Sequence, residues 1–146
     1  MDRKLRIVNE NTDNLKDWMD AAVTAYQTSK AYEWQGDNLL LARESLLYTF
    51  IDNYEFKFGE RPDREHVKEI AFIISWNVWQ MDGLKGVIPN SCHDVETRNL
   101  YGEVERTPCP GCKTKNIHKH NGIPVLLKVF SSGNTYPYHL LYNKNE

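Results

Sequence analysis

The spacing of hydrophobic positions predicts three helices in the first half of the chain. The first follows Thr12 or Asp13, either of which can cap a helix, and its apolar residues recur at intervals of three and four as far as Tyr26. The same spacing marks a longer apolar face over residues 39–58 and a shorter one over 63–74. These faces must be buried, so the three helices are expected to pack together.

Other segments have the pattern of strands. Residues 31–34 are rich in aromatic side chains and precede a turn, and residues 75–81 alternate between apolar and polar positions up to Asp82. Near the end of the chain, residues 125–130 and 136–142 flank a turn-rich linker, which predicts a β-hairpin. The pattern therefore predicts a short strand that delivers an acidic side chain and a carboxyl-terminal hairpin.

The order of these elements predicts a mixed α+β or partial α/β fold, with three helices, a small sheet, a zinc-stapled loop and the hairpin. A chain of 146 residues has the length of one domain. We expect a helical part over residues 1–88 and a loop and hairpin over 89–146, packed as one compact unit. About thirty polar residues after residue 89 lack a periodic pattern, and a compact domain does not normally leave so long a loop unorganised.

Composition and charge narrow the class of protein. Hydrophobic residues make up 40% and charged residues 26% of the chain, which excludes disordered and collagen-like classes. No apolar run approaches the about 18 residues that span a bilayer, and the amino terminus does not resemble a signal peptide, so we expect a cytoplasmic protein without a membrane partner. Residues 106–146 hold six cations and one acid, a charge that fits either an anion-facing surface or an ordinary solvated one.

The polar loop contains residues suited to binding a metal ion. A Cys-Pro-Gly-Cys motif places two thiols close together at a turn, and histidines and a further cysteine lie on either side of it. Zinc takes four sulfur or imidazole ligands, and its binding would supply the folding energy that the loop lacks. We therefore predict a zinc site formed by Cys92, Cys109, Cys112 and His120, with His118 as the alternative histidine ligand.

The alternatives to structural zinc are a redox pair, incidental cysteines and a catalytic metal. A redox Cys-x-x-Cys motif is expected at the start of a helix, whereas residues 113–120 are polar and show no helical face. A catalytic zinc needs an open position and a nearby acid or base, and residues 109–120 contain no Asp or Glu. An odd number of cysteines, three, also argues against a disulfide framework.

Residues 31–38 and 73–84 together resemble the middle of an adenine-specific DNA methyltransferase of the restriction-modification type, over about residues 3–88. The resemblance implies that Glu33 holds the ribose of S-adenosylmethionine and that Asp82 faces its adenine. Such ligands bind beyond the carboxyl ends of strands. The alternative is that Asp37 caps a helix and that Asp82 merely forms a turn.

The sequence departs from that family in two motifs. The glycine-rich cofactor loop and the Asn/Asp-Pro-Pro-Tyr/Phe element that grips a flipped adenine are both absent, and residues 89–91 are no substitute for the second. We therefore expect no autonomous methylation. The central strand of the family's sheet is also missing, so the exposed edge is expected to be covered by the loop, the hairpin or a second copy of the chain in a homodimer.

Three functions follow from these expectations. The first is a non-catalytic zinc-binding protein of phage or mobile-element type, as the resemblance implies, that inhibits or regulates a host nuclease or defence complex. The second is a subunit or fragment of a split methyltransferase, which binds S-adenosylmethionine through Glu33 and Asp82. The third is a nucleic-acid binder that places Lys113, Lys115 and Lys119 on phosphates.

Overall fold

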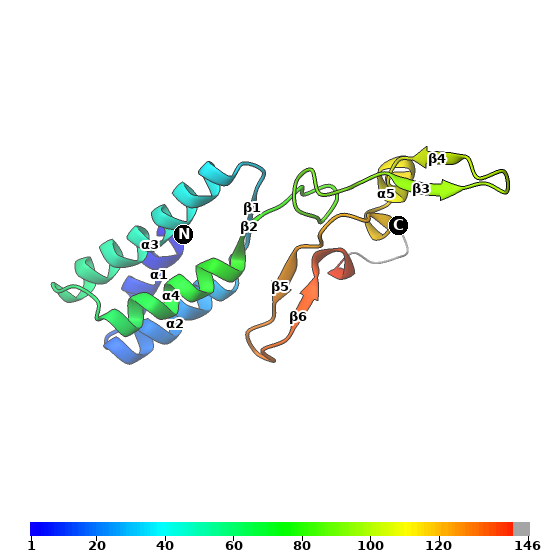
Figure 1. The fold of residues 1–146 in the computed structure, drawn as a ribbon. Coiled ribbons are helices and arrows are strands. Elements are labelled where there is room, and N and C mark those ends of the chain that lie inside the picture. The colour runs from blue at the N-terminus through cyan, green and yellow to red at the C-terminus, as the bar shows by residue number, and fades with distance from the viewer. Residues whose placement is uncertain (142–146) are drawn as a thin grey trace. The chain divides into compact units, whose positions relative to one another are not determined.

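The computed structural model describes residues 1–141 and divides into two compact units, Met1–Trp79 and Gln80–Glu146. The described residues form five α-helices, two 3-10 helices and three two-stranded sheets (Figure 1). This arrangement confirms the predicted mixed α+β fold. Along the chain, the boundary between the units falls between Trp79 and Gln80. The sequence analysis placed it after residue 88.

Four helices and one small sheet build the first unit. They are α1 (Asp2–Asn11), α2 (Leu15–Gln27), β1 (Ala31–Glu33), α3 (Gly36–Phe58), α4 (Arg64–Asn77) and β2 (Val78–Gln80), of which β1 pairs with β2. Helix α1, which buries Leu5 alone, is an addition to the predicted elements. No helix in the described part of the chain is long and apolar enough to cross a membrane.

An aromatic cluster forms the core of this unit. Trp18 is fully buried, and its ring lies 5.5–5.7 Å from those of Phe50, Tyr54 and Phe58 on α3. The indole Nε1–H donates to the Asn9 Oδ1 at 2.6 Å, which satisfies the polar atom of this buried side chain. Burial of so large an aromatic surface contributes much of the hydrophobic stabilisation between α2 and α3.

The helix ends lie close to the predicted signals. Helix α2 is capped by Asn14, one or two residues beyond the expected Thr12 or Asp13, because its side chain accepts a backbone N–H of the first turn. Asp63 caps α4 in the same way. Helix α3 ends at Gly59, whose φ of 73° is the left-handed conformation that glycine adopts without strain.

The strand predicted over residues 75–81 is largely wrong. Helix α4 continues to Asn77, and the strand that follows, β2, has only three residues. The Asn77 side chain is buried and donates to the carbonyl oxygens of Tyr26 and Gln27 at 2.9 and 3.0 Å. These bonds hold the last turn of α4 against the end of α2, so tertiary packing extends the helix into a segment with a strand-like pattern.

The second unit contains short elements joined by turns. They are the antiparallel pair β3 (Val95–Arg98) and β4 (Val104–Thr107), α5 (Pro110–Thr114), η1 (Ile117–Lys119), the antiparallel pair β5 (Leu126–Lys128) and β6 (Thr135–Pro137), and η2 (Tyr138–Leu141). The last pair confirms the predicted carboxyl-terminal hairpin. The first pair, with α5, occupies much of the loop that the sequence left without secondary structure. The Cys-Pro-Gly-Cys motif therefore lies at the start of a short helix, where the sequence predicted none.

The second strand of the carboxyl-terminal hairpin is shorter than predicted. It ends at Pro137, residues 138–141 form η2, and Tyr142 lies outside the described residues. The ring of Tyr138 lies so close to Gly86 that a Cβ there would come within 2.9 Å of it, and Gly86 has a φ of 67°.

Candidate metal centre

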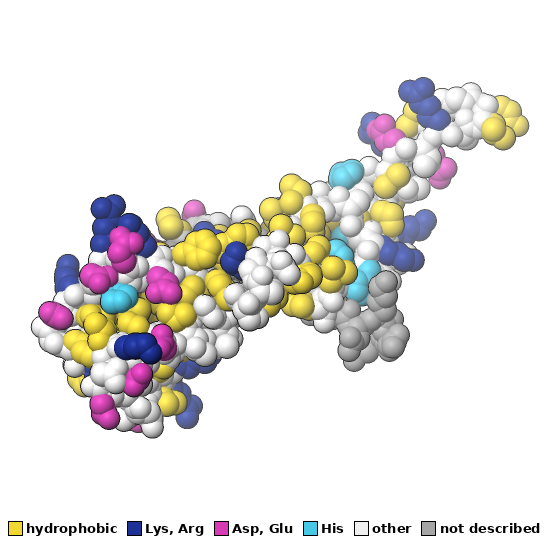
Figure 2. Space-filling model, turned by 90° about the horizontal axis from the view of Figure 1, so that it is seen from below, with side chains coloured by type: hydrophobic (Ala, Val, Ile, Leu, Met, Phe, Trp, Pro, Cys, Tyr) yellow, Lys and Arg dark blue, Asp and Glu magenta, His cyan; other side chains and the backbone are white. Residues whose placement is uncertain are grey.

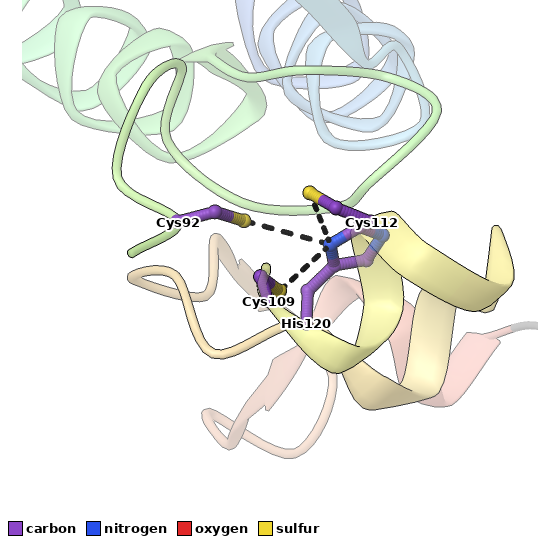
Figure 3. A group of neighbouring side chains, drawn as sticks. All are labelled: Cys92, Cys109, Cys112 and His120. Carbon is purple, nitrogen blue, oxygen red and sulfur yellow. Dashed lines mark hydrogen bonds between the residues drawn. The ribbon is translucent and has the colours of Figure 1, made fainter. Parts of the chain in front are cut away.

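Four side chains of the second unit converge on one point (Figure 3). They are Cys92, Cys109, Cys112 and His120, and their ligand atoms all lie within 4.8 Å of one another. Cys109 directly precedes α5, Cys112 lies within α5, and His120 directly follows η1. The structure thus brings together the four residues that the sequence selected, and they could hold a metal ion.

The distances within the cluster fit tetrahedral coordination. The Sγ atoms of Cys92, Cys109 and Cys112 lie 3.5, 3.7 and 3.7 Å from the Nδ1 of His120. Zinc–sulfur and zinc–nitrogen bonds of about 2.3 and 2.0–2.1 Å at tetrahedral angles place sulfur and nitrogen about 3.6 Å apart. Hydrogen bonds do not explain this geometry, because a neutral imidazole nitrogen accepts only one hydrogen bond.

The donor set indicates which metal the cluster would prefer. Three thiols and one imidazole suit zinc, whereas calcium and magnesium require oxygen ligands. Four protein ligands complete a tetrahedron, as structural zinc sites do, and leave no position for water or a substrate. A zinc ion held by all four residues would therefore be a closed site of the structural kind.

A tight turn positions the two cysteines of the Cys-Pro-Gly-Cys motif. Pro110 is the first residue of α5, where a missing N–H costs nothing, and Lys115 ends the helix in the left-handed conformation with a φ of 53°. A Cβ at Gly111 would lie 2.5 Å from the backbone nitrogen of His120. Only glycine permits this approach, so the turn and the histidine segment depend on each other.

Asn121 links the segments that carry the ligands. Its backbone N–H donates to the Sγ of Cys109 at 3.4 Å. Its side chain makes two bonds to the backbone of His93, accepting from the N–H at 3.2 Å and donating to the carbonyl at 2.7 Å. Asn121 was not among the residues predicted from the sequence. Its amide side chain directly after a candidate histidine ligand was the available signal, because residues that hydrogen-bond to metal-binding segments often lie beside the ligands.

Ser91 and Gly122 hold the segment that carries Cys92 against the residues that follow Asn121. The Ser91 hydroxyl accepts the N–H of Ile123 at 2.9 Å and donates to the carbonyl of Ile88 at 2.6 Å. A Cβ at Gly122 would lie 2.6 Å from the Ser91 Oγ and 3.1 Å from both the nitrogen and the sulfur of Cys92. The segments pack so closely that a side chain at position 122 would displace the Ser91 hydroxyl and shift Cys92.

The thiols differ in acidity because their surroundings differ. Burial acts to raise the pKa of Cys109, but backbone N–H groups, among them that of Asn121, and the His120 side chain outweigh it and set the pKa at about 6. Burial and the neighbouring thiols of Cys109 and Cys112 raise the pKa of Cys92 to about 11. Cys109 therefore ionises at a lower pH than Cys92.

A lysine balances the negative charge that ionised thiols create. Burial acts to lower the pKa of Lys85, but the thiols of Cys112 and Cys92 and the carboxylate of Asp82 raise it above its usual value. The Lys85 Nζ lies 3.4 Å from the Asp82 Oδ2. Three thiolates around a divalent ion carry a net charge of −1, so a nearby ammonium group stabilises the filled site as well.

The two acids expected to bind S-adenosylmethionine form local bonds. The Glu33 carboxylate, in the first unit, accepts the N–H of Gln35 at 3.0 Å. The buried Asp82, in the second unit, accepts the N–H of Leu84 at 3.1 Å and pairs with Lys85. These bonds are typical of a turn, the alternative weighed above, and the cofactor role of both acids stays a prediction.

The other histidines near the motif lie outside the metal-binding group. The ring of His118 stacks edge-on against His139 with 5.8 Å between centroids, and His118 is not among the converging residues. His93 contributes backbone atoms to the contact with Asn121, while its side chain is exposed. The geometry therefore favours His120 over His118 as the histidine ligand.

Comparison with known proteins assigns no family to this chain. It matches no family model, no curated protein and no solved structure. The resemblance of residues 3–88 to adenine-specific DNA methyltransferases stays a prediction.

We predict that His120→Gln lowers the zinc content of the purified chain from about one ion to well below half an ion, because it removes one of four ligands. His118→Gln is the matched control, since His118 lies two residues away and outside the cluster. Metal content is measured by elemental analysis of the folded proteins. Equal zinc in both variants would contradict the assignment of His120.

A second prediction concerns the close packing behind Cys92. Gly122→Ala should weaken zinc binding at least tenfold, because the added methyl group displaces the Cys92 backbone and sulfur. Gly83→Ala is the control, since a Cβ at that position meets nothing within 4 Å. Competition with a chromogenic chelator measures both affinities, and an unchanged affinity in Gly122→Ala would show that the segment can shift freely.

Proposed function

We propose that this chain is a non-catalytic binding protein whose second unit is folded around a structural zinc ion. The observation that supports this proposal is the approach of three thiols to one imidazole nitrogen at 3.5–3.7 Å. A site with four protein ligands has no open position for a reacting molecule. The metal would then serve the fold, and the surface of the unit would perform the function.

The second unit has reason to depend on such an ion. Few large side chains are buried in it; the main ones are Met81, Val87, Val125 and Leu127. Its strands have only three or four residues each, and short hairpins are marginally stable in water. Zinc binding contributes folding free energy directly in small domains, so the ion would supply what this small core does not.

The candidate binding element is the tip of the β3–β4 hairpin, which consists of residues 99–102. The tip is held by Asn99, whose backbone and side chain bond to the N–H groups of Tyr101, Gly102 and Glu103, all at 3.0 Å. Yet the two central residues, Leu100 and Tyr101, are 102% and 90% exposed. A type I turn accepts most residues at these positions, so the turn itself does not require apolar ones.

A protein with an apolar pocket is the partner that fits this tip. Hydrophobic side chains end the arm that the hairpin forms (Figure 2). Three acidic and two basic residues lie in residues 95–107, a balance that disfavours contact with a polyanion. Large side chains on a preorganised turn bind at little entropic cost and are typical interface anchors. We propose a component of a host nuclease or defence complex as this partner.

A second candidate function is supported by a different surface. Lys113, Lys115 and Lys119 are exposed on α5, η1 and their junction, and none forms an ion pair within the described residues. Residues 106–141 contain five cations and no acid. These lysines could contact nucleic-acid phosphates, with an affinity that falls steeply as salt concentration rises.

The zinc hypothesis predicts a selective unfolding of the second unit. Removal of the ion with a strong chelator should collapse the amide NMR signals of residues 80–141, because the ligand segments lose their common anchor. The signals of α1 to α4 provide an internal control, since the aromatic core of the first unit contains no ligand. Signals of the second unit that persist in the metal-free chain would contradict the proposal.

The partner class is tested by capture from a bacterial lysate treated with nuclease. We expect the zinc-loaded chain to retain one protein that Leu100→Ser/Tyr101→Ser loses, because the tip no longer fills an apolar pocket. The variant with Lys113, Lys115 and Lys119 all changed to Glu is the control and should retain it. Nucleic acid captured only from untreated lysate, and lost with the lysine variant, would instead support the second candidate.

A further inference from the structure

The first unit contains a hollow whose rim is strongly basic. Its volume is about 250 Å³, and it lies where the start of α1 meets the ends of α2 and α4. Arg3, Lys4 and Lys30 line it, and none of the described residues along it is acidic. This hollow is independent of the metal centre, since every lining residue belongs to Met1–Trp79.

The three cations have no acidic partners among residues 1–141. The Nζ of Lys4 donates to the Ser29 hydroxyl at 2.7 Å, and the Nζ of Lys30 donates to the Asn77 Oδ1 at 3.1 Å. Each ammonium group has three donors, so each retains N–H groups for another acceptor. Arg3 makes no side-chain hydrogen bond or ion pair within residues 1–141. The positive charge of the hollow is therefore uncompensated.

The position of Lys30 in the hollow disfavours its charged form. Burial lowers the pKa of its ammonium group, because partial removal of water disfavours the charged form. An anion placed beside this ammonium group would favour its charged form and so oppose the effect of burial.

The floor of the hollow is apolar. Tyr26, Leu46 and Ile74 contribute to it, and Tyr26 and Ile74 are buried. The Tyr26 hydroxyl donates to the carbonyl of Leu46 at 2.7 Å, and burial raises its pKa, so the phenol stays neutral. A ligand would thus meet cations at the rim and hydrocarbon or ring surface below.

We propose that this hollow binds a small organic anion, with a carboxylate or phosphate head between Arg3, Lys4 and Lys30 and a short apolar group on the floor. The volume admits a single ring or a chain of a few carbons, and ligand sites commonly combine an apolar wall with a few polar groups. The proposal adds a second site to the chain and does not depend on zinc.

The test uses phenyl phosphate as the probe and the full-length, zinc-loaded chain. Titration should shift the amide NMR signals of Lys4, Ser29, Lys30 and Ala31 in a saturable manner. Benzoate, with the same ring and a carboxylate head, shows which head group binds more tightly, and either order supports the site. Inorganic phosphate should bind more weakly, because it leaves the floor uncovered, and phenol should not bind, because it lacks the charge.

Variants locate the site and separate it from general attraction of anions. Lys4→Met and Lys30→Met should each weaken binding about tenfold, as expected for the loss of one hydrogen bond to a charged group. Lys16→Met, which removes an exposed lysine paired with Asp20 on α2, is the matched control and should change the affinity less than twofold. Circular dichroism verifies that each variant keeps its helices.

Three results would overturn the proposal. They are the absence of saturable shifts with either aromatic anion, equal weakening in all three lysine variants, and unchanged binding in the Lys4→Met/Lys30→Met double variant. The last two would assign the shifts to nonspecific ionic attraction. The failure of zinc binding would not affect this test, because the hollow and the metal centre share no residue.

Discussion

The approach of three thiols to one imidazole nitrogen is the constraint on which the second unit depends. Such a group is unfavourable without a cation, because the thiols shift one another's ionisation and only one can bond to the nitrogen. The surrounding contacts keep the four side chains together. Gly111 permits the close approach of His120, Gly122 permits that of Cys92, and Asn121 bonds to Cys109 and to the backbone of His93. Together these contacts keep the four side chains close enough to hold a metal ion.

The two units differ in the interactions that would stabilise them. The first buries a tryptophan among phenylalanine and tyrosine rings and ends its helices with ordinary caps. The second has short strands and a small core, so it would rely on coordination bonds. The two units would therefore respond to different changes: removal of a metal ion would act on the second unit, and loss of an aromatic side chain would act on the first.

Each unit has surface groups without a matching partner among the described residues, and these groups indicate what the unit could bind. A metal ion held by all four ligands would leave no open position for a reacting molecule, while the hairpin tip exposes two large apolar side chains on a hydrogen-bonded turn. In the first unit, the positive charge of three cations is not balanced: they line a hollow in which none of the described lining residues is acidic. Each feature costs free energy in isolation, and a bound partner or ligand would recover it.

The sequence by itself determined the features that depend on neighbouring residues. Periodicity located the helices around Trp18, Phe50 and Ile70, and the Cys-x-x-Cys motif pointed to the four residues that converge in the structure. Tertiary structure alone decided the extension of α4 to Asn77, the place of Asn121 and Gly122 behind the ligands, and the basic hollow. These depend on contacts between segments distant in the chain, and local spacing contains no information about which distant backbone will approach.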